Sequence, residues 1–120
     1  MKKRVVVTGT GIISPIGEDW ATVYAALKAK QNAVRVMDEW VVNPKIRSKL
    51  AAPAIFTEPG FPRKTVRGMG RVALLAVTAA HRAVVQAGLL DNPVLSGGRS
   101  GVACGVSSGS YKAIKELVSI

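Results

Sequence analysis

Apolar residues open the chain as a short continuous run. Valines at 5–7 stand between basic residues on one side and the sequence Thr-Gly-Thr-Gly on the other. A β-branched run without polar alternation is typical of a strand buried on both faces of a sheet. A similar apolar run lies at 102–105. The pattern predicts core strands at 5–8 and 102–105 and, with the helices described next, an α/β fold.

A helix is expected directly after the first turn. Its apolar residues recur at positions i, i+3, i+4 and i+7, and they are Trp20, Val23, Tyr24 and Leu27. Asp19 is suited to cap the N-terminus, and the helix is expected to end near Lys30, where a cation suits the negative end of the dipole. The stripe predicts an amphipathic helix that packs this face on a sheet.

Two further stretches have contrasting patterns. Residues 31–62 hold four prolines, which exclude long regular elements and predict a surface excursion with a short strand near 51–56. Residues 64–89 are rich in alanine, which predicts a helix with a thin surface that ends at Gly88. Helical spacing returns at 111–120.

The turn after the first strand invites a dinucleotide-binding hypothesis. Gly9 and Gly11 supply two glycines of the pattern G-x-G-x-x-G, but the third position is Ser14, and Pro15 obstructs the helix that should begin there. A tight strand-to-helix turn, in which glycine avoids a side-chain clash, is the better interpretation.

Composition indicates a folded chain that needs more sheet than it contains. Of 120 residues, 48% are apolar and 20% charged, as a packed core requires. Two strands do not make a stable sheet, so we expect an incomplete domain. The net charge of +10 is concentrated at 2–4, 45–49 and 63–71. Such a surface suits an acidic carrier protein or nucleic acid, or it serves solubility alone.

Few residues are suited to metal binding or disulfide formation. Cys104 and His81 are the single members of their kinds, which excludes a disulfide framework and makes a metal site unexpected. A single cysteine makes the reducing cytoplasm the expected compartment. We also expect a soluble protein, since no apolar run is long enough for a membrane span and no cleavage pattern follows the first strand. His81 is interpreted as a partly exposed helical histidine.

The sequence G-V-S-S-G at 105–109 fits the pattern G-x-S-x-G between a strand and a helix. A serine hydrolase would use Ser107 as its nucleophile. The hydrolase order places the histidine after the serine, whereas His81 precedes it. The alternative is that small residues here let the backbone approach a neighbouring element or an acyl ligand.

Several blocks together resemble one enzyme family. The opening VVVTG with its continuation to G-x-x-S-P-x-G covers 5–17, and R-K-x-x-R-x-M at 63–69 begins the alanine-rich helix, which runs to A-G-L at 87–89. The third block is R-S-G-V-A-C-G at 99–105, followed by S-S-G-S at 107–110. These blocks are similar to the β-ketoacyl-acyl carrier protein synthases, KAS II-like condensing enzymes of the thiolase-like superfamily.

The resemblance implies a layered α-β-α-β-α fold, of which 1–120 would be an incomplete N-terminal portion. It implies an acyltransferase that condenses an acyl thioester with malonyl-acyl carrier protein, with loss of carbon dioxide and without a cofactor. The family's nucleophilic cysteine and two histidines lie downstream, so none maps onto this chain, which alone should be inactive. Cys104 matches an apolar strand position and is expected to be buried and inert.

Two sets of site residues carry over from the resemblance. Arg63, Lys64 and Arg67 match basic positions that help to dock the acidic carrier protein. The segment lining the acyl pocket is matched by Ser107, Ser108 and Gly109. Ser108 stands where elongation synthases can carry a bulky gating residue, which leaves the preferred acyl length open.

Alternatives remain at this point. The family implies a homodimer or a heterodimer of ketosynthase chains, and a chain-length-factor-like partner would share the fold without the nucleophile. A basic nucleic-acid-binding module is a further alternative, but the sequence lacks the recognition motif and the aromatic residues interleaved with basic ones that such a module would need. We therefore expect acyl carrier protein as the partner, with no nucleic acid and no membrane.

Overall fold

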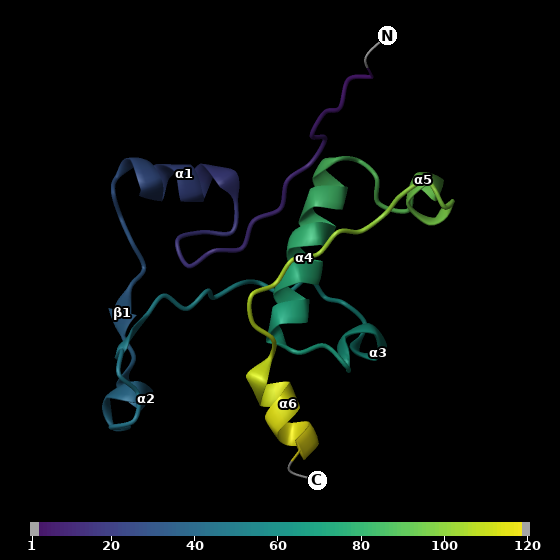
Figure 1. Cartoon of the computed structure of the whole chain (residues 1–120). Helices are drawn as coiled ribbons and strands as arrows, with labels where there is room; N and C mark the ends of the chain where they lie inside the picture. Colours follow the sequence, from purple (N-terminus) through teal and green to yellow (C-terminus); the bar gives the residue numbers. More distant parts are fainter. Residues whose placement is uncertain (1–2, 119–120) are drawn as a thin grey trace. The chain divides into compact units, whose positions relative to one another are not determined.

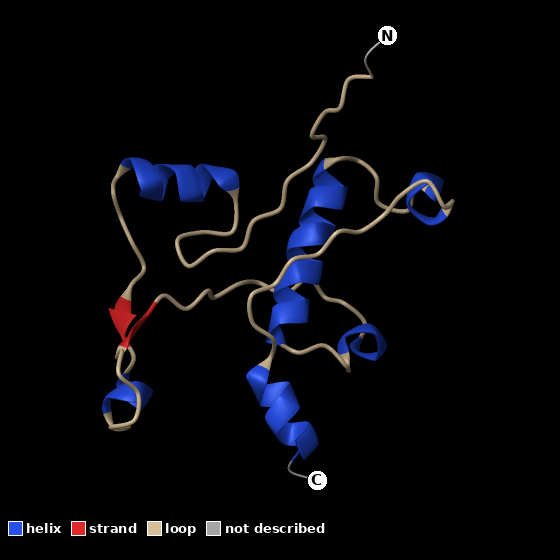
Figure 2. Cartoon of the chain, in the orientation of Figure 1, coloured by secondary structure: helices blue, strands red, loops and turns tan. Residues whose placement is uncertain are grey.

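The computed structural model describes residues 3–118, except for the side chains of 112, 113, 116 and 117. The elements are α1 (Trp20–Lys28), β1 (Arg35–Val36), α2 (Asp38–Val41), β2 (Leu50–Ala51), α3 (Arg63–Val66), α4 (Arg71–Gln86), α5 (Pro93–Ser96) and α6 (Tyr111–Val118) (Figures 1 and 2). They form two compact units, one of Ile12–Thr57 and one of the described residues on either side of it. Within residues 3–118, no helix combines the length and apolarity needed to cross a membrane.

Helix α1 begins where the capping residue predicted. The backbone N–H of Thr22 donates to Oδ1 of Asp19 at 2.9 Å, and the Thr22 hydroxyl donates to Oδ2 at 2.6 Å. These hydrogen bonds favour the charged carboxylate and lower the pKa of Asp19 below its ordinary value. The predicted packing face is wrong in part. Val23 and Ala26 are buried, whereas the rest of the predicted stripe, Trp20, Tyr24 and Leu27, is exposed.

A small hairpin follows α1 in the same unit. Strands β1 and β2 pair antiparallel, with Arg35 opposite Ala51 and Val36 opposite Leu50. The predicted strand at 51–56 is thus correct at its first residue only. The exclusion of long elements from the proline-rich stretch is confirmed.

Helix α4 organises the larger unit, and the N-terminal segment lies against it (Figure 1). A Cβ atom at Gly9 would overlap the carbonyl oxygen of Ala83 and lie 3.0 Å from the backbone nitrogen of Ala87. A Cβ at Gly11 would overlap the carbonyl oxygen of Ala79. The expected clash is confirmed, and the obstacle is the helix backbone.

A side chain of α4 also binds this segment. Oε1 of Gln86 accepts hydrogen bonds from the backbone N–H of Thr10 at 2.6 Å and from its hydroxyl at 3.1 Å. The thin alanine face and this double acceptor together explain how an extended segment can lie so close to a helix.

Neither predicted core strand is paired in this structure. Residues 3–8 and 101–106 run without helical turns (Figure 1) but belong to no strand among the described residues. Val5 and Val102 are both 94% exposed. The prediction of strands buried on both faces is therefore wrong for this chain, because pairing and burial need neighbouring strands. The same cause overturns the expected burial of Cys104, which is exposed.

The predicted alanine-rich helix is interrupted near its start. Helix α3 ends at Val66, and α4 begins at Arg71, after Gly70 in an extended conformation with ψ of 170°. Its predicted end is confirmed, since Gly88 has a φ of +67°. The predicted C-terminal helix is confirmed as α6, while residues 119 and 120 lie outside the described residues.

Candidate functional site

The three basic residues of the predicted docking site lie on and just after α3. Pro62 precedes the helix, and its carbonyl oxygen accepts a hydrogen bond from the N–H of Thr65 at 2.8 Å. Arg63, Lys64 and Arg67 are all exposed. Because Arg67 keeps helical dihedral angles as the C-cap, it lies one turn above Arg63 and on the same side of the helix. This short helix therefore concentrates positive charge on one of its sides.

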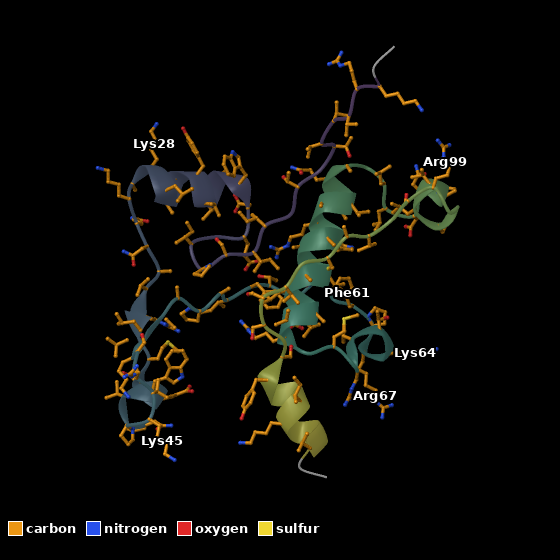
Figure 3. The ribbon with its side chains drawn as sticks, in the orientation of Figure 1. Lys28, Lys45, Phe61, Lys64, Arg67 and Arg99 are labelled. Carbon is orange, nitrogen blue, oxygen red and sulfur yellow. The ribbon has the colours of Figure 1, made fainter. Side chains whose placement is uncertain are left out.

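We call these three residues the docking cations. Figure 3 shows Lys64 and Arg67 extending from α3 away from α4. Among the side chains that the structure describes, no carboxylate forms an ion pair with any of the docking cations. Their charge is therefore available to an acidic partner.

An aromatic contact holds the chain just before α3 against α4. The rings of Phe61 and His81 meet edge to face, with centroids 5.3 Å apart and planes at 89°. Both residues are half-buried. His81 is thus a partly exposed helical histidine, as predicted, and it contacts a residue two positions before Arg63. Sequence reasoning missed this pairing, because nothing local links positions 61 and 81.

The predicted acyl-lining residues Ser107, Ser108 and Gly109 lie in an exposed loop that leads into α6. The next residue is tied to the start of α4, where the N–H of Val72 donates to the Ser110 hydroxyl at 3.1 Å. Gly70, the N-cap of α4, has no side chain to accept such a bond, so Ser110 takes this capping role. Its role was also missed, since the cap comes from a distant part of the sequence.

Helix α4 therefore contacts the chain next to both candidate segments. It contacts the approach to the docking cations through His81 and the end of the acyl-lining loop through Val72. No hydrogen bond joins His81 to Ser107 among the residues described, so the hydrolase hypothesis gains no geometric support. In the same described part of the chain, no three His, Cys, Asp or Glu side chains gather to hold a metal ion.

Comparison with known proteins identifies the family. Residues 2–119 match the family model of the beta-ketoacyl synthase N-terminal domain. This chain belongs to the β-ketoacyl synthase family. The resemblance found in the sequence blocks is thereby confirmed.

Individual relatives agree with this family assignment. The chain is 37% identical over 110 residues to 3-oxoacyl-[acyl-carrier-protein] synthase 1 of Haemophilus influenzae, covering 90% of this chain and 26% of the relative. It is 32% identical to the granaticin polyketide putative beta-ketoacyl synthase 1 of Streptomyces violaceoruber, covering 96% and 27%. The crystal structure of a beta-ketoacyl synthase from Burkholderia phymatum matches 98% of this chain and 29% of its own, with 43% identity and a TM-score of 0.88.

The chain thus spans about a quarter of the length of the curated relatives it matches. The high TM-score means that these residues have the conformation of the corresponding part of a β-ketoacyl synthase. The α/β character of the fold follows from that similarity, although the described residues contain only one strand pair.

Proposed function

We propose that the whole protein catalyses a decarboxylating Claisen condensation between an acyl thioester and malonyl-acyl carrier protein, in chain elongation of the fatty acid or polyketide type. The family match over residues 2–119 carries this proposal. Relatives of both kinds support it, since one is named as a 3-oxoacyl-[acyl-carrier-protein] synthase and another as a granaticin polyketide putative beta-ketoacyl synthase. The proposal includes the complete layered α-β-α-β-α fold, in which residues 1–120 are the N-terminal portion.

Within that protein, the docking cations would receive the acidic carrier protein. Their exposure supports this assignment, as does their lack of ion-pair partners among the described side chains. Association through such a surface is steered by charge and weakens as salt screens it. The proposed partner is an acyl carrier protein. The proposal also includes a cytoplasmic location and a homodimer or heterodimer of ketosynthase chains.

The residues at 107–109 would line the acyl pocket. The two serines and the glycine are small, and Ser110 fixes the end of their loop to α4. The reacting nucleophile would come from another part of the protein, so these 120 residues alone should be inactive in condensation.

Binding of a fluorescently labelled holo acyl carrier protein tests the docking assignment. Changing Arg63, Lys64 and Arg67 to glutamate should weaken binding at least about tenfold, because attraction becomes repulsion. The matched control makes the same charge change at Lys28, Lys45 and Arg47, exposed cations of the smaller unit. An equal loss in both variants would mean that only net charge matters, and the docking site would be rejected.

A further inference from the structure

We propose that Phe61 and His81 are positioning residues that set the orientation of the docking cations. This inference rests on the proposed docking of an acidic carrier protein at α3. It adds two residues whose role is to hold α3, and they thereby control how the cations are presented to the partner.

The first support is the place of the aromatic contact in the chain. Phe61 is followed by Pro62, whose φ of −53° is restricted by its ring, and the helix bearing Arg63 and Lys64 begins at once. A displacement of the Phe61 ring is therefore transmitted into the direction of α3. His81 belongs to the regular α4 helix, which provides a fixed support for that ring.

The second support is the weakness of the other connection between α3 and α4. The chain there runs through Gly68 and Gly70, and a Cβ at Gly68 would meet no atom within 4 Å. One backbone hydrogen bond, from the N–H of Met69 to the carbonyl oxygen of Val66 at 2.9 Å, follows α3. Glycine leaves the backbone many conformations, so this link alone cannot orient the short helix.

Helix α3 is thus a four-residue helix that lies between the flexible glycine link and the Phe61–His81 contact, which we call the aromatic anchor. Helices this short have little stability of their own. Loss of the anchor leaves the charges in place but spreads them over many orientations, and binding must then bear the cost of ordering them.

The experiment measures binding of labelled holo acyl carrier protein to the protein with Phe61→Ala or His81→Ala. Each should weaken binding about threefold to tenfold, the range expected for loss of one aromatic pair. The double variant should be no weaker than either single variant, because both remove the same contact. His81→Phe restores a ring and should recover binding.

Two further readouts separate orientation from charge. The slope of affinity against salt should stay that of the wild type in the alanine variants, since all three cations remain, whereas the glutamate triple variant should change it. Adding Gly68→Ala to His81→Ala should recover part of the lost affinity, because alanine restricts the link and fits in open space.

The outcomes distinguish this inference from the docking proposal. If the alanine variants bind like the wild type while the glutamate variant fails, the positioning role is wrong and docking stands. If the glutamate variant binds normally, the docking proposal itself is wrong. Should Phe61→Ala lose helical circular dichroism, His81→Gln decides, because glutamine favours helix but has no ring. Wild-type binding by His81→Gln overturns the positioning role, and weakened binding supports it.

Discussion

Two segments of the larger unit, residues 5–11 and 99–106, each contain a short apolar run and two glycines but have different surroundings. In residues 8–11, both glycines face the backbone of α4 so closely that a Cβ would overlap a carbonyl oxygen. In residues 99–106, a Cβ added at Gly101 or Gly105 would meet no atom within 4 Å. The first segment needs glycine in order to pack on the helix, whereas the second has no such requirement within the described structure.

The difference shows what a short apolar run predicts and what it does not. Such a run favours a strand-like path, and in Figure 1 both segments run without helical turns. Pairing and burial depend on neighbouring strands, so Val5 and Val102 remain exposed. For the same reason, Cys104 on the second segment is exposed despite its apolar neighbours.

The sharpest test of the comparison is to place a methyl group on each segment. Gly11→Ala should lower the free energy of unfolding by about 2 kcal/mol or more, because the new Cβ overlaps the carbonyl oxygen of Ala79. Gly105→Ala is the matched control and should change it by less than about 0.5 kcal/mol. Urea unfolding measures both. Equal effects would abolish the distinction between the two segments.

A smaller effect is expected from the side chain that holds the first segment. Gln86→Ala removes the acceptor of both hydrogen bonds from Thr10 and should lower the unfolding free energy by about 1 kcal/mol. Gln86→Glu keeps an oxygen acceptor and should retain most of the stability. If the two variants unfold at the same urea concentration, these hydrogen bonds do not hold the segment.

The second segment has its own attachment, just beyond its open part. Ser110→Ala removes the acceptor for the N–H of Val72 and should cost about 0.5–1 kcal/mol, as loss of a helix cap does. Ser108→Ala, two residues earlier, is the control and should have no comparable effect. Hydrogen exchange of the Val72 amide offers a direct measurement, since its protection should fall in the first variant and persist in the second.

In the smaller unit, the Asp19 cap of α1 should make stability depend on pH. Hydrogen bonds from Thr22 lower the pKa of Asp19 below its ordinary value of 3.8. A carboxyl group with a lowered folded-state pKa stabilises the protein above its unfolded pKa, and this contribution is lost as pH falls through the folded value. Asp19→Asn should therefore reduce the acid dependence of stability below about pH 4, while changes at Gly11 should not. Unchanged acid dependence in Asp19→Asn would contradict this account.

Local signals predicted much of this fold. The cap at Asp19, the end of the long helix at Gly88 and the scarcity of regular structure between Gln31 and Pro62 all follow from single residues and short-range rules. The exposure of the docking cations also follows from their charge. These features depend on the residue itself and its immediate neighbours, so they can be predicted from the local sequence.

The remaining features depend on residues far apart in the chain. The contact of Phe61 with His81 and the capping of α4 by Ser110 join distant segments without a local motif. The exposure of Trp20 could not be read from helical spacing, because a stripe shows that a face is apolar but not what covers it. The interruption between α3 and α4 had a local signal in its glycines, although the alanine-rich pattern outweighed it.

The most direct test of the central claim is a residue-resolved titration of the isotope-labelled protein with unlabelled holo acyl carrier protein, followed by amide chemical shifts. The account predicts that the largest changes fall at residues 61–71, around the docking cations and their aromatic anchor. It also predicts that the basic cluster at 45–49 stays unperturbed. Changes concentrated at 45–49, or spread evenly over all basic residues, would contradict the assignment of α3 as the docking site.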